Sequence, residues 1–401
     1  MELKEGFKKT EIGFIPVDWK TENLRENLLG IPKYGINASA VTFDSRLPTY
    51  LRITDITDEG RINPDSLASV NHRAANEYRL EEYDVVFART GASVGKSYLY
   101  QKKDGEFVYA GFLIRVQTDH HKLYAPYLFQ FSKSAQYWKW IREHSMRSGQ
   151  PGVNGKQYSE LQIPLPPSIK EQKVIANALS DADSYIESLE KLIAKKQLIK
   201  KGVMQELLTG KRRLDGCYHS WSKKTLGEIS EIIMGQSPLS SFYNTFGNGL
   251  PLIQGNSDII NRKPIQRVFT TNVTKKGEPG DILISVRAPV GTVAKASFDC
   301  CLGRGICALR NAGDFLYYAL EAKESHWSSL SKGSTFDSVT SLELKNFLIH
   351  YPNDEIERNL ISQVIINIDE DIRGTEKALT KARQIKQGMM QQLLTGRIRL
   401  V

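Results

Sequence analysis

The sequence predicts an α+β protein in which two mixed α/β globular domains are separated by two long α-helices that form an antiparallel coiled coil. The first observation is an internal duplication: residues 171–214 and 357–400 are identical at 18 of 44 positions, without gaps, at a constant offset of 186 residues. Both copies also place apolar residues at helical spacing. The remaining sequence consists of short β-like runs set among Gly, Pro, Asn and Ser turns, which is typical of mixed globular domains.

Residues 1–167 form the first predicted globular domain, with β-like runs such as "YDVVFAR" and "VYAGFLIRVQT". Its "GASVGKS" segment is similar to a phosphate-binding loop, but Gly91 precedes Gly95 by four positions, one fewer than such a loop requires. The corresponding "RAPVG" of the second half keeps Arg287 and Gly291 and lacks the Gly-Lys-Ser group. We therefore predict that Gly91 and Gly95 are turn residues after a strand, and that the Arg shared by the two loops reaches DNA or fixes the turn.

Residues 168–212 are predicted to form the first long helix, and residues 354–401 the second. Ser168 follows a Pro-rich turn and can cap the first helix, as Asn353 or Asp354 can cap the second. Gly210 and Gly396 suit left-handed C-caps. The apolar positions of the two helices are Ile175, Ala178, Ala182, Tyr185, Leu189, Leu192, Ile199 and Val203 in the first, and Ile361, Val364, Ile368, Thr375, Ala378, Ala382, Ile385 and Met389 in the second.

Because the two apolar stripes match in register, packing the helices against each other buries both stripes, and a pseudo-twofold duplication makes such a pair antiparallel. The alternative is that each helix packs on its neighbouring domain. Residues 213–353 form the second predicted globular domain. Its sequence has diverged from the first, yet landmarks correspond, such as "VDWK" with "HSWSKK" and "YDVVFAR" with "GDILISVR".

The chain is basic, with a net charge of +9, and eight Lys or Arg residues lie between Lys191 and Arg213. Such a segment fits DNA phosphates, an acidic partner surface or simply a solvated helix face. No apolar stretch reaches the roughly 18 residues needed to cross a bilayer, and the charged start lacks a signal region, so we expect a cytoplasmic protein without membrane contact. The four cysteines and the adjacent His120 and His121 lack metal-binding spacing, so no metal site is predicted.

Several segments in repeated order carry a resemblance to a known family: the opening "FKKTEIGFIPVDWK", the domain ends "LQIPLPPSIKEQ" and "FLIHYPNDEIER", and the helix ends "LLTGKRRL" and "LLTGRIRL". In this order the chain resembles the specificity (S) subunit of a type I restriction-modification system. The second domain end departs from the first in its Pro-rich turn. The resemblance also implies a circular pseudosymmetry, in which residues 1–20 follow the second helix as residues 215–228 follow the first.

The resemblance implies a DNA-recognition protein without catalysis of its own. Each globular domain would be a target recognition domain that reads one half of a bipartite double-stranded DNA target. The helices would set the spacer and dock two methyltransferase (M) subunits and, through them, the restriction (R) subunits. No cofactor is expected on this chain, and S-adenosylmethionine and ATP are expected on the partner subunits. A coiled-coil scaffold whose globular domains bind protein, and a nucleotide-dependent enzyme, remain alternatives.

Polar loops at strand ends are the best positions for side chains that read base edges, although such loops are also common as plain turns. In the first domain the candidates are Arg89, Thr90, Ser93, Lys96, Arg147, Ser148, Gln150, Asn154, Lys156 and Gln157. In the second domain they are Gln236, Asn256, Arg287, Lys332, Ser334 and Thr335.

Overall fold

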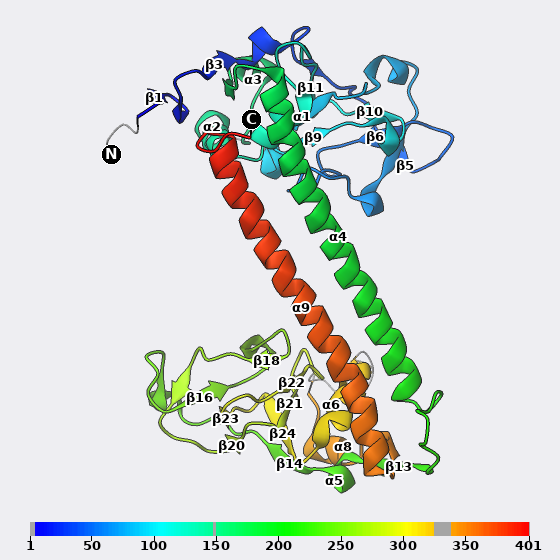
Figure 1. The fold of residues 1–401 in the computed structure, drawn as a ribbon. Helices are drawn as coiled ribbons and strands as arrows, with labels where there is room; N and C mark the ends of the chain where they lie inside the picture. The colour runs from blue at the N-terminus through cyan, green and yellow to red at the C-terminus, as the bar shows by residue number, and fades with distance from the viewer. Residues whose placement is uncertain (1–4, 147–149, 325–337, 401) are drawn as a thin grey trace. The chain divides into compact units, whose positions relative to one another are not determined.

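The chain forms two compact units that share both long helices. The computed structural model describes residues 5–146, 150–324 and 338–400. Unit 1 comprises Met1–Leu189 with Ala378–Val401, and unit 2 comprises Glu190–Lys377. The two long helices are α4 (Ile169–Leu207) and α9 (Glu355–Leu393), each a single continuous helix in the ribbon (Figure 1). Each unit therefore consists of one globular part and one segment of each helix.

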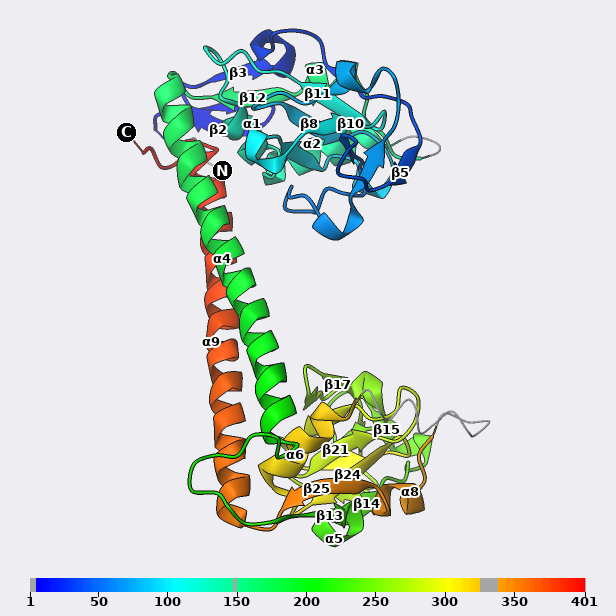
Figure 2. The same cartoon turned by 90° about the vertical axis from the view of Figure 1, so that its right-hand side faces the viewer.

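The globular part of unit 1 is built on two four-stranded sheets (Figure 2). One sheet has the order β4 (Lys33–Tyr34), β11 (Leu113–Val116), β8 (Val85–Ala88) and β9 (Ser97–Leu99) and is antiparallel. The other has the order β10 (Phe107–Tyr109), β6 (Thr49–Leu51), β7 (Ala68–Val70) and β5 (Ala40–Thr42), with β10 and β6 parallel. The hairpin β1 (Phe7–Thr10) and β2 (Gly13–Pro16) and the pair β3 (Lys20–Asn23) and β12 (Gln162–Leu165) complete the strands.

Three short helices cover this part of unit 1: α1 (Ala125–Phe131), α2 (Ala135–Ser145) and α3 (Gly155–Ser159). Aromatic side chains fill the space between helices and sheet, and the ring of Phe87 stacks on Tyr158 with 4.7 Å between centroids. Ile175 and Leu179 of α4 and Leu393 of α9 are buried in the same core. The end of each long helix is therefore fixed to the globular part by apolar packing, which stabilises in proportion to the area removed from water.

Unit 2 repeats this architecture of two sheets. The sheet β14 (Glu231–Met234), β24 (Ile306–Arg310), β21 (Ile282–Ser285) and β22 (Val293–Lys295) corresponds to the first sheet of unit 1. The second sheet has the order β15 (Tyr243–Asn244), β19 (Phe269–Thr270), β16 (Leu250–Ile253), β23 (Cys300–Leu302) and β20 (Lys276–Gly277), and β16 and β23 are parallel. The remaining elements are the pairs β13 (Trp221–Thr225) with β25 (Leu348–Pro352) and β17 (Ile259–Ile260) with β18 (Lys263–Pro264), and the helices α5 (Leu226–Ile229), α6 (Gly313–Ala322) and α8 (Ser341–Lys345).

The predicted capping residues are confirmed, but α4 and α9 end at Leu207 and Leu393, before the predicted bounds at residues 212 and 401. The Ser168 hydroxyl accepts a hydrogen bond from the Glu171 N–H at 3.2 Å, and Asp354 Oδ1 accepts one from the Ile356 N–H at 3.0 Å. Gly210 and Gly396 have φ values of +71° and +65°. Only glycine adopts this left-handed conformation without steric cost, so the chain leaves the helical direction at these positions, three residues after the last helical residue.

The long helices are antiparallel in each unit, but their seam differs from the predicted stripe. In unit 1, Ile186 and Leu189 of α4 are buried against Ala382 of α9. In unit 2 the seam is polar, where Lys196 Nζ donates to Asp371 Oδ1 at 2.7 Å and to Thr375 Oγ1 at 2.8 Å. Both packing alternatives therefore hold at once, since the helices contact each other as well as the globular parts.

Four predicted stripe residues are exposed instead, namely Tyr185, Leu192, Ile199 and Ile385, at 56%, 40%, 48% and 52%. The prediction was wrong there because it followed a spacing of 3.5 residues. A straight helix turns once in 3.6 residues, so such a stripe drifts by about 20° per heptad away from the partner.

A buried arginine–glutamate–tryptophan contact occurs in both units at equivalent positions. In unit 2, Arg213 donates to both carboxylate oxygens of the fully buried Glu357 at 2.5 and 2.8 Å, and Trp221 Nε1 donates to the same group at 3.0 Å. In unit 1, Arg399 donates to the buried Glu171 at 2.8 Å and lies over the Trp19 ring. The contact ties the end of one long helix to the start of the other.

Candidate nucleic-acid interface

The "GASVGKS" segment forms a β-hairpin rather than a phosphate-binding loop. It connects the antiparallel strands β8 and β9, whereas a phosphate-binding loop leads from a strand into a helix. Gly91 and Gly95 adopt φ values of +70° and +89°, which confirms them as turn residues. Lys96 Nζ lies 2.7 Å from Asp58 Oδ1 and donates to the Ile56 carbonyl, so this lysine fixes a neighbouring loop.

Three loop segments of unit 1 meet at the end of β8. Arg89 directly follows the strand, its guanidinium lies 4.8 Å from the centre of the Tyr34 ring, and its Nη1 donates to the Gly111 carbonyl at 3.5 Å. The Tyr34 hydroxyl accepts a hydrogen bond from the Gly155 N–H at 2.9 Å. Thr90 pairs with Gly152 in an isolated β-bridge. The structure therefore brings the predicted Arg89 loop together with residues 150–157 of the second predicted loop.

The other candidates of unit 1 have different environments. Ser93 ends the turn and is half-buried, while Lys156 and Gln150 are exposed, and Gln150 packs against Gly91. Asn154 and Gln157 form a reciprocal capping box at the start of α3, in which each side chain accepts a backbone N–H at 2.9 Å. Arg147 and Ser148 lie outside the described residues.

The equivalent loop of unit 2 shows that the two halves are matched differently from the predicted alignment. Arg287 pairs with Ser338 in a β-bridge, as Thr90 pairs with Gly152. The residue equivalent to Arg89 is Val286, whose side chain is buried. The prediction that both loops share an arginine at the same position is therefore wrong, because the shorter second loop shifts the match by one residue.

Exposed arginines gather at the corresponding sheet end of unit 2. Arg287 is exposed two residues after the end of β21, and Arg304 is exposed in the turn between β23 and β24. The Val286 N–H donates to the Gly305 carbonyl at 2.9 Å, so the two arginines are carried by adjoining backbone segments. Gln236 is exposed on the neighbouring strand end, and Asn256 is half-buried at the start of a 3-10 turn. Lys332, Ser334 and Thr335 lie outside the described residues.

Sequence reasoning missed Tyr34 and Phe112 in unit 1 and Arg304 in unit 2. Phe112 is exposed at 56%, and its carbonyl accepts the Arg89 N–H at 3.0 Å. The feature of the sequence that could have indicated these residues is the glycine next to each of them in the chain. A Cβ at Gly35 would lie 2.2 Å from the Tyr109 carbonyl oxygen, and a Cβ at Gly305 would lie 2.3 Å from the Gln254 carbonyl oxygen. These glycines allow close backbone approach, which holds the exposed side chains at the loop tips.

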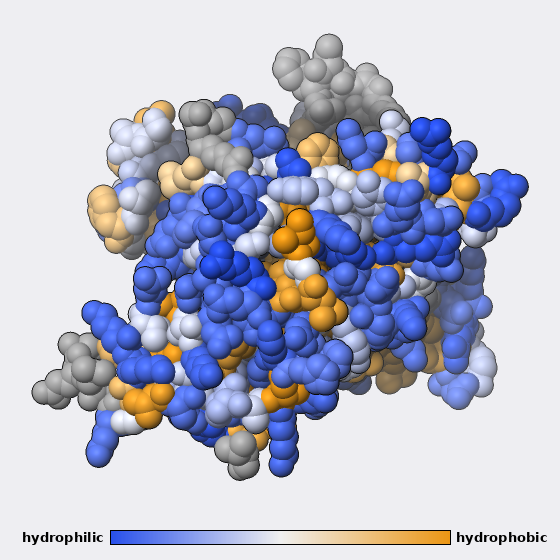
Figure 3. Space-filling view, turned by 90° about the horizontal axis from the view of Figure 1, so that it is seen from above, coloured by the Kyte–Doolittle hydropathy of each residue, from blue (hydrophilic) through white to orange (hydrophobic). Residues whose placement is uncertain are grey.

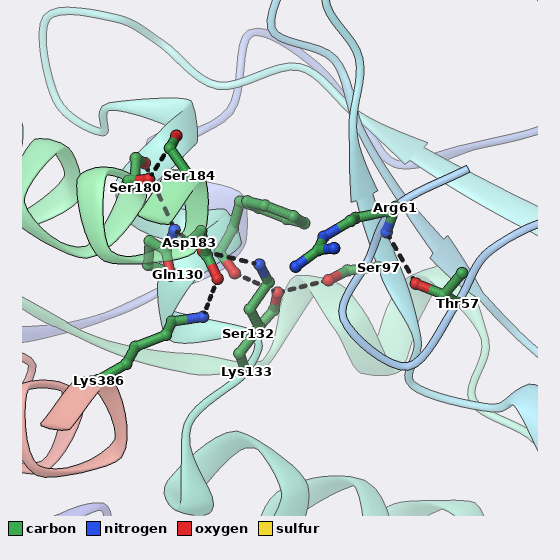
Figure 4. A network of polar contacts seen from close by, with 11 residues as sticks. Thr57, Arg61, Ser97, Gln130, Ser132, Lys133, Ser180, Asp183, Ser184 and Lys386 are labelled. Atoms are coloured by element: carbon green, nitrogen blue, oxygen red, sulfur yellow. Dashed lines mark hydrogen bonds and ion pairs between the residues drawn. The ribbon is translucent and has the colours of Figure 1, made fainter. Parts of the chain in front are cut away.

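A polar network joins α1 and the turn that follows it to the long helices in unit 1 (Figure 4). Asp183 of α4 accepts hydrogen bonds from Gln130 at 3.0 Å, from Lys133 at 3.3 Å and from Lys386 of α9. Burial lowers the pKa of Lys133 to about 8, although Asp183 opposes the shift. Burial alone would raise the pKa of Asp183, but the two lysines prevail and the pKa is lowered.

Unit 2 has a corresponding polar network around Asp369, in which some of the charged side chains differ from those of unit 1. Asp369 accepts from the Tyr318 hydroxyl at 3.0 Å and lies 2.8 Å from Lys200 Nζ, which also contacts Glu321 at 2.8 Å. Glu321 follows Tyr318 by three residues, as Lys133 follows Gln130, so it takes the place of Lys133. The network is therefore a shared structural device whose surroundings have diverged.

Three further properties of the described residues concern the surface, membrane spans and metal ligands. Hydrophilic residues dominate the face seen in Figure 3, where apolar residues occur in small groups. Among residues 5–146, 150–324 and 338–400, no helix combines the length and apolarity that a bilayer span requires. The same residues contain no group of three His, Cys, Asp or Glu side chains arranged to hold a metal ion.

Comparison with known proteins identifies the architecture. A family model described as the type I restriction modification DNA specificity domain matches twice, at residues 34–199 and 218–382. The chain is 32% identical to the protein described as the MjaX specificity subunit of Methanocaldococcus jannaschii, over 99% of this chain and 97% of that protein. It is 24% identical to the type I restriction enzyme MjaVIII specificity subunit of the same organism, with the same coverage.

Two solved structures share the fold. A chain from a structure of type I R-M complex assembly and conformational transition has a TM-score of 0.61 at 25% identity, covering 96% of this chain and 99% of that chain. The S subunit of a type I restriction-modification system from M. genitalium has a TM-score of 0.65 at 16% identity and covers 98% of both chains, which supports the fold alone. The chain therefore belongs to the family of type I restriction-modification DNA specificity proteins, as a specificity subunit with two recognition domains.

Proposed function

We propose that each globular part reads one half of a bipartite double-stranded DNA target. The observation that carries this proposal is the contrast between a retained scaffold and altered loop tips. Both units keep the β-bridge, the capped short helix and the close glycine approaches, while the residues at matching positions differ, as at the half-buried Thr90 and the exposed Arg287. Two readers of different sequences need the same platform and different hydrogen-bonding side chains at base edges.

Arginine is the residue best suited to such reading in unit 2. Its guanidinium can donate two hydrogen bonds to the O6 and N7 atoms of guanine in the major groove. Arg287 and Arg304 are exposed on adjoining segments, and we assign them to base contacts in this half-site. In unit 1 we assign Arg89, Tyr34 and Gln150 to the equivalent surface.

The long helices are proposed to set the spacer between the half-sites and to dock two methyltransferase subunits and, through them, the restriction subunits. Each helix has 39 residues and a length of about 58 Å. We further propose that the chain acts in the cytoplasm without catalysis or a cofactor of its own. S-adenosylmethionine and ATP would then be bound by the partner subunits, and the base that is methylated would be flipped out by the methyltransferase.

The decisive experiment is reconstitution of this chain with its cognate methyltransferase, followed by methylome sequencing of a host with and without the gene. A bipartite methylated motif that disappears on deletion is the expected result. Salt-dependent binding to DNA without any sequence selectivity, by the reconstituted complex, would contradict DNA recognition and favour a scaffold whose globular parts bind protein.

A further inference from the structure

The turn that connects the two sheets carries different side chains in the two units. In unit 1 it joins β10 to β11 and comprises residues 110–112, Ala-Gly-Phe, and in unit 2 it joins β23 to β24 and comprises residues 303–305, Gly-Arg-Gly. The first residue of each turn donates its N–H to β6 or β16, at 2.9 and 2.7 Å. The last residue accepts an N–H, at 3.0 and 2.9 Å, from the residue that follows β8 or β21. The backbone contacts are therefore the same, but the exposed side chain is Phe112 in one unit and Arg304 in the other.

Phe112 is held in place although its side chain is 56% exposed. On one side the Gly111 N–H donates to the Ile36 carbonyl at 2.8 Å, and on the other side the Leu113 N–H donates to the Ala110 carbonyl at 2.8 Å. A Cβ added at Gly111 would lie 3.3 Å from the Ile36 carbonyl oxygen, so the two segments approach closely. An apolar side chain stabilises a fold by leaving water. The exposed ring therefore adds little to the fold and is presented at a defined position.

The surroundings of Phe112 are those of the recognition surface of unit 1. Its carbonyl accepts the N–H of the half-buried Arg89, whose guanidinium lies 4.8 Å from the centre of the Tyr34 ring. Two exposed lysines suit DNA phosphates: Lys33 precedes Tyr34, and Lys156 lies in α3, whose first residue donates its N–H to the Tyr34 hydroxyl. Phe112 therefore adds an apolar side chain to a surface that is equipped for phosphates and base edges.

Base edges offer few groups that an apolar ring can bury. In the major groove every base presents hydrogen-bond donors or acceptors, and thymine alone adds a methyl group, at C5. A phenyl ring makes no such hydrogen bond, so packing on this methyl group is the way in which it distinguishes base pairs there. The other use of an apolar side chain is as a wedge between base steps in the minor groove. Arg89 and Gln150, which lie in the two joined loops, match major-groove edges and favour the methyl contact.

We propose that Phe112 determines the specificity of unit 1 by packing against the C5-methyl group of a thymine in its half-site. This half-site then contains an A·T pair at the position that the turn of residues 110–112 meets. The matching turn of unit 2 carries Arg304, and arginine reads guanine rather than thymine. The inference rests on the proposed function, in which unit 1 reads DNA, and it names a base pair and the residue that reads it.

The test compares thymine with uracil, which lacks only the C5-methyl group. The full chain, in complex with its cognate methyltransferase, is titrated with DNA that carries the methylated motif, with uracil replacing thymine in one half-site at a time. For one half-site the Kd is expected to rise about fourfold, the factor that corresponds to burying one methyl group. Phe112→Ser should bind the thymine and uracil forms of that half-site equally. Phe112→Leu should retain the preference for thymine, because leucine is also apolar.

Phe43→Ser is the matched control, since Phe43 is 48% exposed directly after β5 in the other sheet of unit 1. This variant should keep the thymine preference, as should Arg304→Ala, which alters the turn of unit 2. The comparison is made within each variant, so a change in stability does not affect it. Equal affinity of the wild type for both forms, as a wedge between base steps would give, or a thymine preference that survives in Phe112→Ser, would overturn the methyl contact alone. A complex without any sequence-selective binding would overturn the proposed function as well.

Discussion

Replacing Glu357 by glutamine tests the buried arginine–glutamate–tryptophan contact. The carboxylate is fully buried and accepts hydrogen bonds from Arg213 at 2.5 and 2.8 Å and from Trp221 at 3.0 Å. Glutamine keeps the shape but removes the charge and turns one acceptor into a donor. Breaking a buried ion pair costs about 3–5 kcal/mol. Because the Arg213 side chain is 31% exposed and water can reach it, we expect the substitution to lower the free energy of unfolding by about 3 kcal/mol.

The equivalent change in unit 1, Glu171→Gln, supplies the internal comparison. Arg399 also donates to both carboxylate oxygens of Asp18, at 3.0 and 3.2 Å, and keeps this partner when Glu171 is neutralised. Among the described residues, Arg213 keeps the His219 carbonyl as its remaining hydrogen-bond acceptor. We therefore expect about half the loss, roughly 1.5 kcal/mol, for Glu171→Gln.

Hydrogen exchange measured peptide by peptide, together with urea unfolding, separates the two units because each substitution acts locally. Exchange should accelerate around residues 205–225 and 350–362 in Glu357→Gln, and less strongly around residues 15–25 and 165–175 in Glu171→Gln. Equal losses in both variants, or a larger loss for Glu171→Gln, would refute the argument that Asp18 compensates for the missing carboxylate.

Three further predictions follow from the recognition surface, the buried lysine and the helices. Arg287→Ala and Arg304→Ala should each weaken DNA binding by about 1–3 kcal/mol and relax base selectivity in one half-site only. The measurement compares binding to DNA altered in one half-site or in the other. Loss of selectivity in both half-sites would contradict the assignment of these arginines to base contacts. The folded chain binds the Lys133 proton less tightly than the unfolded chain, because burial lowers the pKa to about 8 from 10.5. The Lys133→Met variant should therefore have a larger free energy of unfolding than wild type below pH 8, and this difference should disappear as the pH rises towards 10.5. A difference that does not depend on pH would contradict the prediction. A heptad inserted at matched positions in α4 and α9 adds about 10 Å to each helix and should widen the methylated motif by about three base pairs; an unchanged spacing in the methylome would reject the spacer role.

The sequence was most informative where a feature depends on local geometry or on repetition. The left-handed turns at Gly210 and Gly396 after the helices and the caps at Ser168 and Asp354 follow from backbone sterics and from side chains within three residues, and the structure confirms them. The duplication was visible because both copies must bury similar residues at the same spacing. The family assignment follows from the order of these features along the chain.

The candidate site was predictable as loops but not as individual side chains. Asn154 and Gln157 are engaged in capping α3, although their residue types suit base reading equally well. The match of Arg287 with Thr90 depends on β-bridges between segments that are 51 residues apart in unit 2 (287 to 338) and 62 residues apart in unit 1 (90 to 152), which no local pattern reveals. Arg304 was missed because only the close approach of Gly305 to Gln254 shows that the turn is held in place.

What the sequence determined by itself is the plan of the molecule: two copies of one unit, their long helices and the positions where those helices begin and end. These properties depend on interactions between residues that are close in sequence, or on a repeat that can be counted. The tertiary structure alone decided which face of each helix is buried, which of the charged residues are paired, and which loop residues are presented together. Those outcomes depend on contacts between distant segments, whose register is set by the packing of the whole unit.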